Sequence, residues 1–222
     1  MAVLLSARRA RASEILLDIG AVHCNLAEPY TFTSGWKSPV YVDCRKIITP
    51  PVARRAIVQL AADVIAREVG RDQIDVVAGG ETAGIPFAAW LADYFFLPMV
   101  YVRKQPKGFG RGAQIEGDLQ PGQRAILVED LATDARSKVN FCRALTGAGA
   151  RVANAFAVFY YGVYPDAEKN LAEAGVRLLA LTDWRTTLDV AEARGYFDAT
   201  QVKAVREFLA APDVWSKAHG GV

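Results

Sequence analysis

The sequence predicts one α/β domain with a parallel sheet that helices cover on both faces. Two patterns carry this prediction. Five short apolar segments lack the strict alternation of a half-exposed sheet, and helix-like segments separate most of them. The composition agrees, because 52% of the 222 residues are hydrophobic and 23% are charged, which is ordinary for a globular protein with a sizeable core.

The N-terminal part of the chain differs from the rest. Residues 13–22 predict an amphipathic helix, with Ser13 as a candidate cap. Residues 23–50 combine three prolines with β-branched and aromatic residues, a mixture that predicts short strands and turns. Helical periodicity returns over 51–70.

Apolar runs then alternate with helical segments. The predicted strands are 74–80, 98–104, 124–130, 151–159 and 176–183. The predicted helices are 83–95, 136–148 and 166–174, with two more within 186–211. We therefore expect a small segment, residues 1–50, packed on a core of residues 51–222, the two forming one structural unit.

Composition also argues against several classes of protein. A formal net charge of +2 gives no sign of a nucleic-acid surface. No apolar run reaches about 18 residues, and the first residues do not resemble a signal peptide. Three widely spaced cysteines and two histidines argue against a zinc site or a disulfide framework. We expect a cytoplasmic protein without nucleic-acid or membrane partners.

Two adjacent acids end the predicted strand 124–130. Glu129 and Asp130 come at its carboxyl end, where an α/β sheet places its ligand. Alternation along the strand turns their side chains to opposite sides, so the like charges need not collide. The carboxylates could accept hydrogen bonds from vicinal hydroxyls, such as those of a ribose, or help to position Mg²⁺. The alternative is that they only cap and solubilise a strand end, and this stretch alone does not decide.

The residues after the acids lead into a helix start. Thr133, Ser137 and the backbone N–H groups there could form an anion site, strengthened by the helix dipole. Neither G-x-G-x-x-G nor GK[ST] occurs here, so this is not a dinucleotide fingerprint or a P-loop. The acids at the strand end suit ribose hydroxyls, and the hydroxyl-bearing loop with the helix start suits a phosphate. Together they suit a ligand that has both.

A basic, glycine-rich stretch, YVRKQPKGFGRGAQIEG (101–117), follows another predicted strand. Arg103, Lys104, Lys107 and Arg111 would repel one another without an anion between them. Four glycines would make the segment mobile, which is typical of a lid that closes over a polyphosphate. The alternative is a solvated surface loop.

The stretch GGETAGIPFA (79–88) also lies at a strand's carboxyl end and leads into a helix. Gly79, Gly80 and Gly84 would permit a close approach of backbone to ligand, although glycine also serves any tight strand-to-helix turn.

With FTSGWKSPVYVDCR (32–45), these three stretches resemble the orotate phosphoribosyltransferase family, from about residue 14 to about residue 211. The resemblance implies a type I phosphoribosyltransferase sheet flanked by helices, with a small N-terminal hood. It implies transfer of phosphoribose from 5-phosphoribosyl 1-pyrophosphate (PRPP) to orotate, giving orotidine 5′-monophosphate and pyrophosphate in pyrimidine (UMP) biosynthesis. It also implies Mg²⁺ as cofactor and a homodimer in which each lid reaches into the neighbouring subunit's site.

The same resemblance gives roles to three sets of residues. The candidate catalytic residues are Arg103, Lys104, Lys107 and Asp130. Beside these, the PRPP-binding set contains Glu129, Leu131, Ala132, Thr133, Asp134, Ala135, Arg136 and Ser137. The candidate orotate contacts are Lys37, Thr133 and Tyr161. Mg²⁺ would bind through the substrate, Glu129 or Asp130.

Several positions depart from the family's usual pattern. Glycine is usual where this chain has Ala135, and a small residue or a hydroxyl where it has Arg136. Phe109 stands where a histidine often ends the lid, and residues 159–165 are rich in tyrosine where many members have an arginine for the orotate carboxylate. These departures leave two other hypotheses open: a protein of this fold that senses PRPP or a nucleotide without turnover, and a transferase for a different base.

Overall fold

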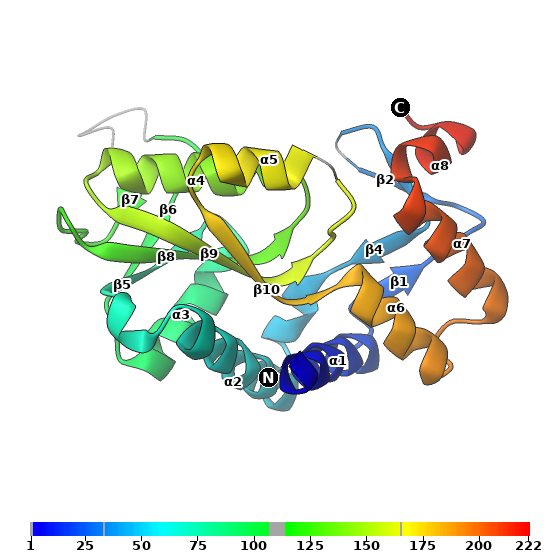
Figure 1. Cartoon of the computed structure of the whole chain (residues 1–222), viewed down its shortest axis with the longest axis horizontal. Coiled ribbons are helices and arrows are strands. Elements are labelled where there is room, and N and C mark those ends of the chain that lie inside the picture. The colour runs from blue at the N-terminus through cyan, green and yellow to red at the C-terminus, as the bar shows by residue number, and fades with distance from the viewer. Residues whose placement is uncertain (1, 33, 107–113, 165) are drawn as a thin grey trace.

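The computed structural model describes residues 2–32, 34–106, 114–164 and 166–222 (Figure 1). Its main sheet has six strands in the order β10-β9-β8-β5-β6-β7, all parallel except β7, which runs antiparallel to β6. Their bounds are β5 Val76–Gly80, β6 Met99–Val102, β7 Ile115–Glu116, β8 Arg124–Ala132, β9 Arg151–Tyr160 and β10 Arg177–Asp183. The predicted α/β class is confirmed.

Helices cover both faces of this sheet, which explains why its strands are continuous apolar runs (Figure 1). On one face lie α1 (Ala2–Asp18), α2 (Pro51–Glu68) and α3 (Gly84–Phe95), and on the other α4 (Arg136–Gly147) and α5 (Asp166–Glu173). The chain ends with α6 (Trp184–Ala193), α7 (Ala199–Ala210) and α8 (Pro212–Ala218). The two helices predicted within 186–211 are α6 and α7, and α8 is an addition. None of the helices in the described ranges combines the length and hydropathy needed to cross a bilayer.

The prediction that Ser13 caps the first helix is wrong. Helix α1 begins at Ala2, so Ser13 lies in its interior, fully buried. The Ser13 hydroxyl shares hydrogen bonds with the hydroxyls of Thr182 and Thr187, at 2.7 and 2.8 Å. This residue therefore ties α1 to β10 and α6, because a buried hydroxyl needs partners and these threonines supply them.

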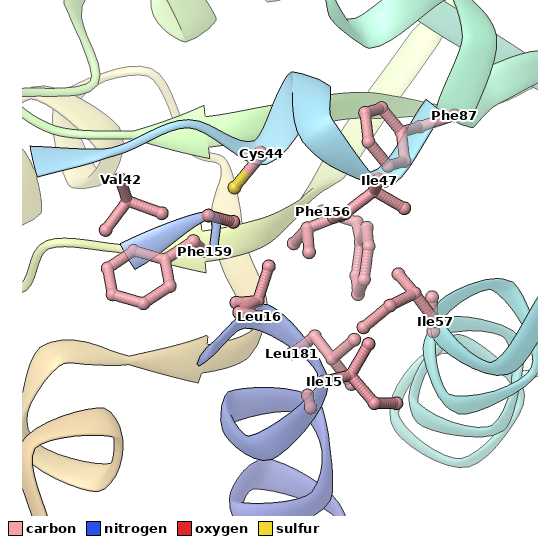
Figure 2. Packing of buried hydrophobic residues seen from close by; sticks show 14 of the residues in the cluster. Ile15, Leu16, Val42, Cys44, Ile47, Ile57, Phe87, Phe156, Phe159 and Leu181 are labelled. Carbon is pink, nitrogen blue, oxygen red and sulfur yellow. The ribbon is translucent and has the colours of Figure 1, made fainter. Parts of the chain in front are cut away.

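Two small antiparallel sheets follow α1. Strand β1 (Val22–Cys24) pairs with β4 (Val40–Val42), and β2 (Tyr30–Thr31) with β3 (Lys37–Ser38). Short 3₁₀ helices, η1 and η2, span Cys44–Ile48 and Arg71–Gln73. Figure 2 shows Val42, Cys44 and Ile47 in the same hydrophobic cluster as Phe156 and Phe159 of β9. This contact fixes residues 22–48 against the sheet. The division of the chain at residue 50 stays a prediction.

Candidate active site

A cavity of about 500 Å³ lies at the carboxyl ends of β5 and β8. Its wall brings together segments that are far apart in the sequence: residues 41–45 from β4 into η1, residues 81–83 after β5, Lys104 after β6, and several residues between 129 and 138 from β8 into α4. A larger hollow between α1 and α6 is lined neither by Glu129 or Asp130 nor by Arg103 or Lys104, the two lid cations that the structure describes. We therefore take the first cavity as the candidate site because of the residues that line it, although the second is larger.

Glu129 is held in the wall of this cavity and is only 5% exposed. Its Oε2 atom lies 2.8 Å from Nζ of Lys138 on α4. Its Oε1 atom is buried and has no hydrogen-bond partner among the described residues. Burial raises the pKa of Glu129 above its ordinary value, and the Lys138 ammonium opposes this rise without cancelling it.

The glycines of the 79–84 stretch make room for the protein itself. A Cβ on Gly80 would overlap Oε1 of Glu129 and lie 2.7 Å from its Cδ, and a Cβ on Gly84 would lie 2.8 Å from the same Oε1. A Cβ on Gly79 would lie 2.9 Å from Cα of Ile85, so this glycine lets α3 pack closely on β5. The glycines thus serve internal packing. Whether they also let a ligand approach the backbone stays a prediction.

Asp130 lies on the other side of β8 from Glu129. Along this strand Ala125 and Leu127 pack on the α4 face, whereas Ile126 and Val128 pack on the face of α1, α2 and α3, so alternation places Asp130 with the latter pair. Asp130 keeps some exposure and lines the cavity. Burial raises its pKa, and the nearby Lys138 lowers it by a smaller amount.

The loop into α4 brings two hydroxyls to the cavity, those of Thr133 and Ser137. Between them Ala135 precedes α4 in the left-handed conformation, with φ +61° and ψ 2°, and is 1% exposed. An alanine therefore adopts a left-handed backbone conformation that glycine would take without strain, at a steric cost.

Of the other residues predicted to bind PRPP on this strand and loop, Ala132, Asp134, Ala135 and Arg136 do not line the cavity. The Arg136 guanidinium is 73% exposed and pairs with the Asp134 carboxylate, with Nε 3.1 Å from Oδ2. Ala132 is fully buried, and its carbonyl accepts a hydrogen bond from the Tyr161 N–H. Leu131 does line the cavity.

The two described cations of the predicted lid point to different places. Lys104 lines the cavity, and its backbone N–H donates to Oε2 of Glu81 at 2.7 Å. Arg103 instead places Nη1 3.6 Å from Oε1 of Glu116 and is not a lining residue. Lys107, Phe109 and Arg111 lie outside the described residues.

Tyr161 lies in the core and does not line the cavity. Its side chain is 2% exposed, its ring packs against Phe159 and Trp184, and its hydroxyl accepts a hydrogen bond from the Val42 N–H at 3.3 Å. Burial raises the pKa of its hydroxyl. The tyrosine-rich stretch carries no mark of which ring is buried, and contact of Tyr161 with orotate stays an untested prediction.

Of the other predicted orotate contacts, Thr133 lines the cavity and Lys37 does not. The backbone N–H of Lys37 donates to Oγ of Ser216 in α8, at 2.9 Å. Strand β3, which begins at Lys37, is therefore tied to the C-terminal end of the described chain.

Sequence reasoning missed several residues of the cavity. Tyr41, Asp43 and Arg45 line it beside Asp130, although they lie in the stretch 32–45 that carried the resemblance. The Arg45 Nε donates to Oδ1 of Asp43 at 2.6 Å, and its Nη2 donates to the Tyr41 hydroxyl at 3.2 Å. Burial raises the pKa of Asp43, but the hydrogen bonds and charge of Arg45 outweigh this and lower it overall. Sequence reasoning also missed Lys138, which lines the cavity and directly follows the predicted residue Ser137.

Comparisons with known proteins agree with this arrangement. A family model described as "Phosphoribosyl transferase domain" matches residues 49–184. Orotate phosphoribosyltransferases of Rhizobium rhizogenes and Agrobacterium fabrum are 48% and 49% identical over 210 residues, which cover 95% of this chain and 90% of each relative.

Solved structures show the same fold. UMP synthase of Leishmania donovani superposes with a TM-score of 0.78 at 25% identity, over 90% of this chain and 42% of that one. Orotate phosphoribosyltransferase from Aeropyrum pernix superposes with a TM-score of 0.69 at 29% identity, over 83% of this chain and 99% of that one. With its type I phosphoribosyltransferase fold and this level of identity, the chain belongs to the orotate phosphoribosyltransferase family.

Proposed function

We propose that this chain transfers phosphoribose from PRPP to orotate, giving orotidine 5′-monophosphate and pyrophosphate as a step of pyrimidine biosynthesis. One observation carries the proposal: Asp130, the hydroxyls of Thr133 and Ser137, and Lys104 surround a single cavity in a member of this family. These groups match a ribose, a phosphate and a departing pyrophosphate, which are the three parts of PRPP.

In this proposal the sugar phosphate binds along β8 and the start of α4. Asp130 accepts hydrogen bonds from the ribose hydroxyls, because its carboxylate lines the cavity and keeps some exposure. Thr133, Ser137 and the backbone N–H groups of the first turn of α4 surround the 5-phosphate, where the helix dipole favours an anion.

The cation on the leaving side is Lys104. Breaking the bond between the ribose and pyrophosphate builds negative charge on the pyrophosphate, and a lysine placed there stabilises that charge. Its backbone is anchored to Glu81, so the loop after β5 sets the position from which the lid begins. The contribution of Lys107 stays a prediction.

The site also fits Mg²⁺, in the manner usual for an ion that arrives with phosphates. Mg²⁺ in proteins is commonly held by one or two carboxylates, the substrate's phosphate oxygens and water. Asp130 can supply the carboxylate, whereas Glu129 already binds Lys138. Among the described residues no group of three ligating side chains could hold a metal ion by itself. Bound with PRPP, Mg²⁺ would neutralise charge on the pyrophosphate.

The predicted homodimer, with each lid completing the neighbouring site, is part of the same proposal. Family membership supports it, and the loop that would cross between subunits begins at the cavity with Lys104. The cytoplasm remains the predicted location.

An assay of orotate absorbance tests the proposal. Orotate should be consumed when PRPP and Mg²⁺ are both present and should persist when either is omitted. Tight PRPP binding without turnover would identify the chain as a sensor. Turnover with another base in a panel, but not with orotate, would identify a transferase of different specificity.

A further inference from the structure

A buried lysine lies at the base of the candidate site. The Lys138 side chain is 9% exposed, and its Nζ lies 2.8 Å from Oε2 of Glu129 and 3.2 Å from Oγ of Ser137. A buried ammonium is costly unless it is paired and hydrogen-bonded, and here both partners are residues of the cavity wall. Lys138 therefore connects Glu129 of β8 to the Ser137 hydroxyl in the first turn of α4.

The contact with Ser137 determines what that hydroxyl can do. An ammonium group has three donors and no acceptor, so the Ser137 oxygen must accept a hydrogen bond from Lys138. The hydroxyl hydrogen is then left to donate to another group. Since Ser137 lines the cavity in the first turn of α4, its hydrogen is available to an anion bound there.

The contact with Glu129 determines where that carboxylate stays. One oxygen binds Lys138, and the other occupies the space beside Gly80 and Gly84, where no side chain stands. Turning Glu129 into the cavity would break the ion pair and leave Lys138 as an unpaired buried charge. Glu129 is thus an anchor for Lys138, and Asp130 is the acid free to meet the sugar.

We propose that Lys138 is a positioning residue for the sugar phosphate: anchored by Glu129, its ammonium orients the Ser137 hydroxyl to donate to the 5-phosphate. The inference rests on the proposed function, because it takes the phosphate to bind at the start of α4. It adds a role that neither the acid pair nor the hydroxyls of the loop reveal by themselves.

Calorimetric titration with two probes, ribose 5-phosphate and inorganic pyrophosphate in the same Mg²⁺ buffer, tests the proposal. Lys138→Met keeps the length of the side chain and removes its charge. This variant should bind ribose 5-phosphate on the order of 10-fold more weakly, the size expected for a hydrogen bond assisted by charge. Pyrophosphate affinity should stay within about twofold. Lys203→Met, an exposed lysine on α7, is the matched control and should change neither affinity.

Ser137→Ala separates positioning through the serine from a general effect of charge. If Lys138 acts through Ser137, Lys138→Met should weaken ribose 5-phosphate binding far less in the Ser137→Ala background than in the wild type. Lys138→Arg keeps a donor and should restore part of the affinity. Fully additive effects, or equal loss for both probes, would overturn the proposal.

Removing one charge of a buried pair can unfold a protein, so a second variant is needed. The double variant Glu129→Gln with Lys138→Met removes both charges and should melt near the wild-type temperature. Its affinity for ribose 5-phosphate should nevertheless stay below that of the wild type, because no ammonium orients the Ser137 hydroxyl. If the wild type itself fails to bind ribose 5-phosphate and PRPP, the proposed function fails. If the wild type binds ribose 5-phosphate, and Lys138→Met and the double variant bind it as tightly as the wild type does, only the role of Lys138 fails.

Discussion

The carboxylate of Glu129 fills the space that a side chain on Gly80 would need. A Cβ on Gly80 would overlap Oε1 of Glu129, and it would also lie 2.8 Å from Cε2 of Phe141. Gly80 is the last residue of β5, and Glu129 lies within the neighbouring parallel strand β8, so the glycine on one strand permits the buried acid on the next. The position of the acid pair thus depends on a residue outside its own stretch.

Gly80→Ala should displace Glu129 and weaken its contact with Lys138. Overpacking of this kind costs about 1–3 kcal/mol, so we expect a lower free energy of unfolding in urea and weaker PRPP binding. Gly147→Ala is the matched control, because a Cβ at the end of α4 meets no atom within 4 Å. The control should be neutral or slightly stabilising. Equal unfolding free energies and equal PRPP affinities for the two variants would show that Glu129 moves aside without cost.

Ala135→Gly should stabilise the protein. An L-residue in the left-handed conformation costs roughly 1 kcal/mol, and glycine removes most of that cost. Because Ala135 already adopts φ +61°, the loop should keep its shape and the affinity for ribose 5-phosphate should change by less than about twofold. Ala148→Gly, at φ −87°, is the control and should give no gain in melting temperature. A large gain in phosphate affinity would show instead that the alanine Cβ crowds the ligand.

Lys104→Ala should remove most turnover without affecting the fold. Loss of one preorganised donor to a developing negative charge costs about 10²- to 10³-fold in kcat. The side chain is exposed, and the hydrogen bond to Glu81 uses the backbone N–H, so the melting temperature should not change. Lys203→Ala should retain wild-type kcat. Unchanged turnover in Lys104→Ala would remove this residue from the mechanism.

Ser216→Ala should loosen strand β3, which begins at Lys37. The fully buried Ser216 hydroxyl accepts from the Lys37 N–H and donates to the Val222 carbonyl, at 2.9 and 3.0 Å. Losing both bonds should cost about 1–3 kcal/mol in unfolding free energy. If Lys37 contacts orotate, the KM for orotate should rise while the KM for PRPP stays constant. Equal changes in the two KM values would argue against that role.

The sheet and the acid pair could be predicted because their signals are local. Apolar runs identify buried strands, and Asp130, Thr133 and Ser137 follow one another in a single strand–loop–helix unit. The pairing of Lys138 with Glu129 could not be predicted, because it depends on how α4 is turned toward β8. Burial of Tyr161 likewise comes from packing among residues distant in the sequence.

The ion pair of Asp75 and Arg124 makes stability depend on pH at the end of the sheet opposite the cavity. Arg124 donates to both carboxylate oxygens, with Nε 2.9 Å from Oδ2 and Nη2 2.7 Å from Oδ1, and its backbone N–H also donates to Oδ2. These hydrogen bonds hold the pKa of Asp75 well below its ordinary value of 3.8. The unfolded chain therefore binds a proton at a higher pH than the folded protein does, and the pair stabilises the fold above pH 3.8.

That stabilisation should disappear as the pH falls below 3.8 toward the depressed pKa of the folded state. Asp75→Asn should accordingly lower the free energy of unfolding in urea at about pH 6, and the difference from the wild type should shrink at about pH 3. The effect should be modest, because the pair is partly exposed. Since Asp75 and Arg124 lie at the amino ends of β5 and β8, kcat/KM at neutral pH should stay within about twofold of the wild type. A difference in unfolding free energy that is constant across this range would mean that the carboxylate's ionisation contributes nothing to the fold.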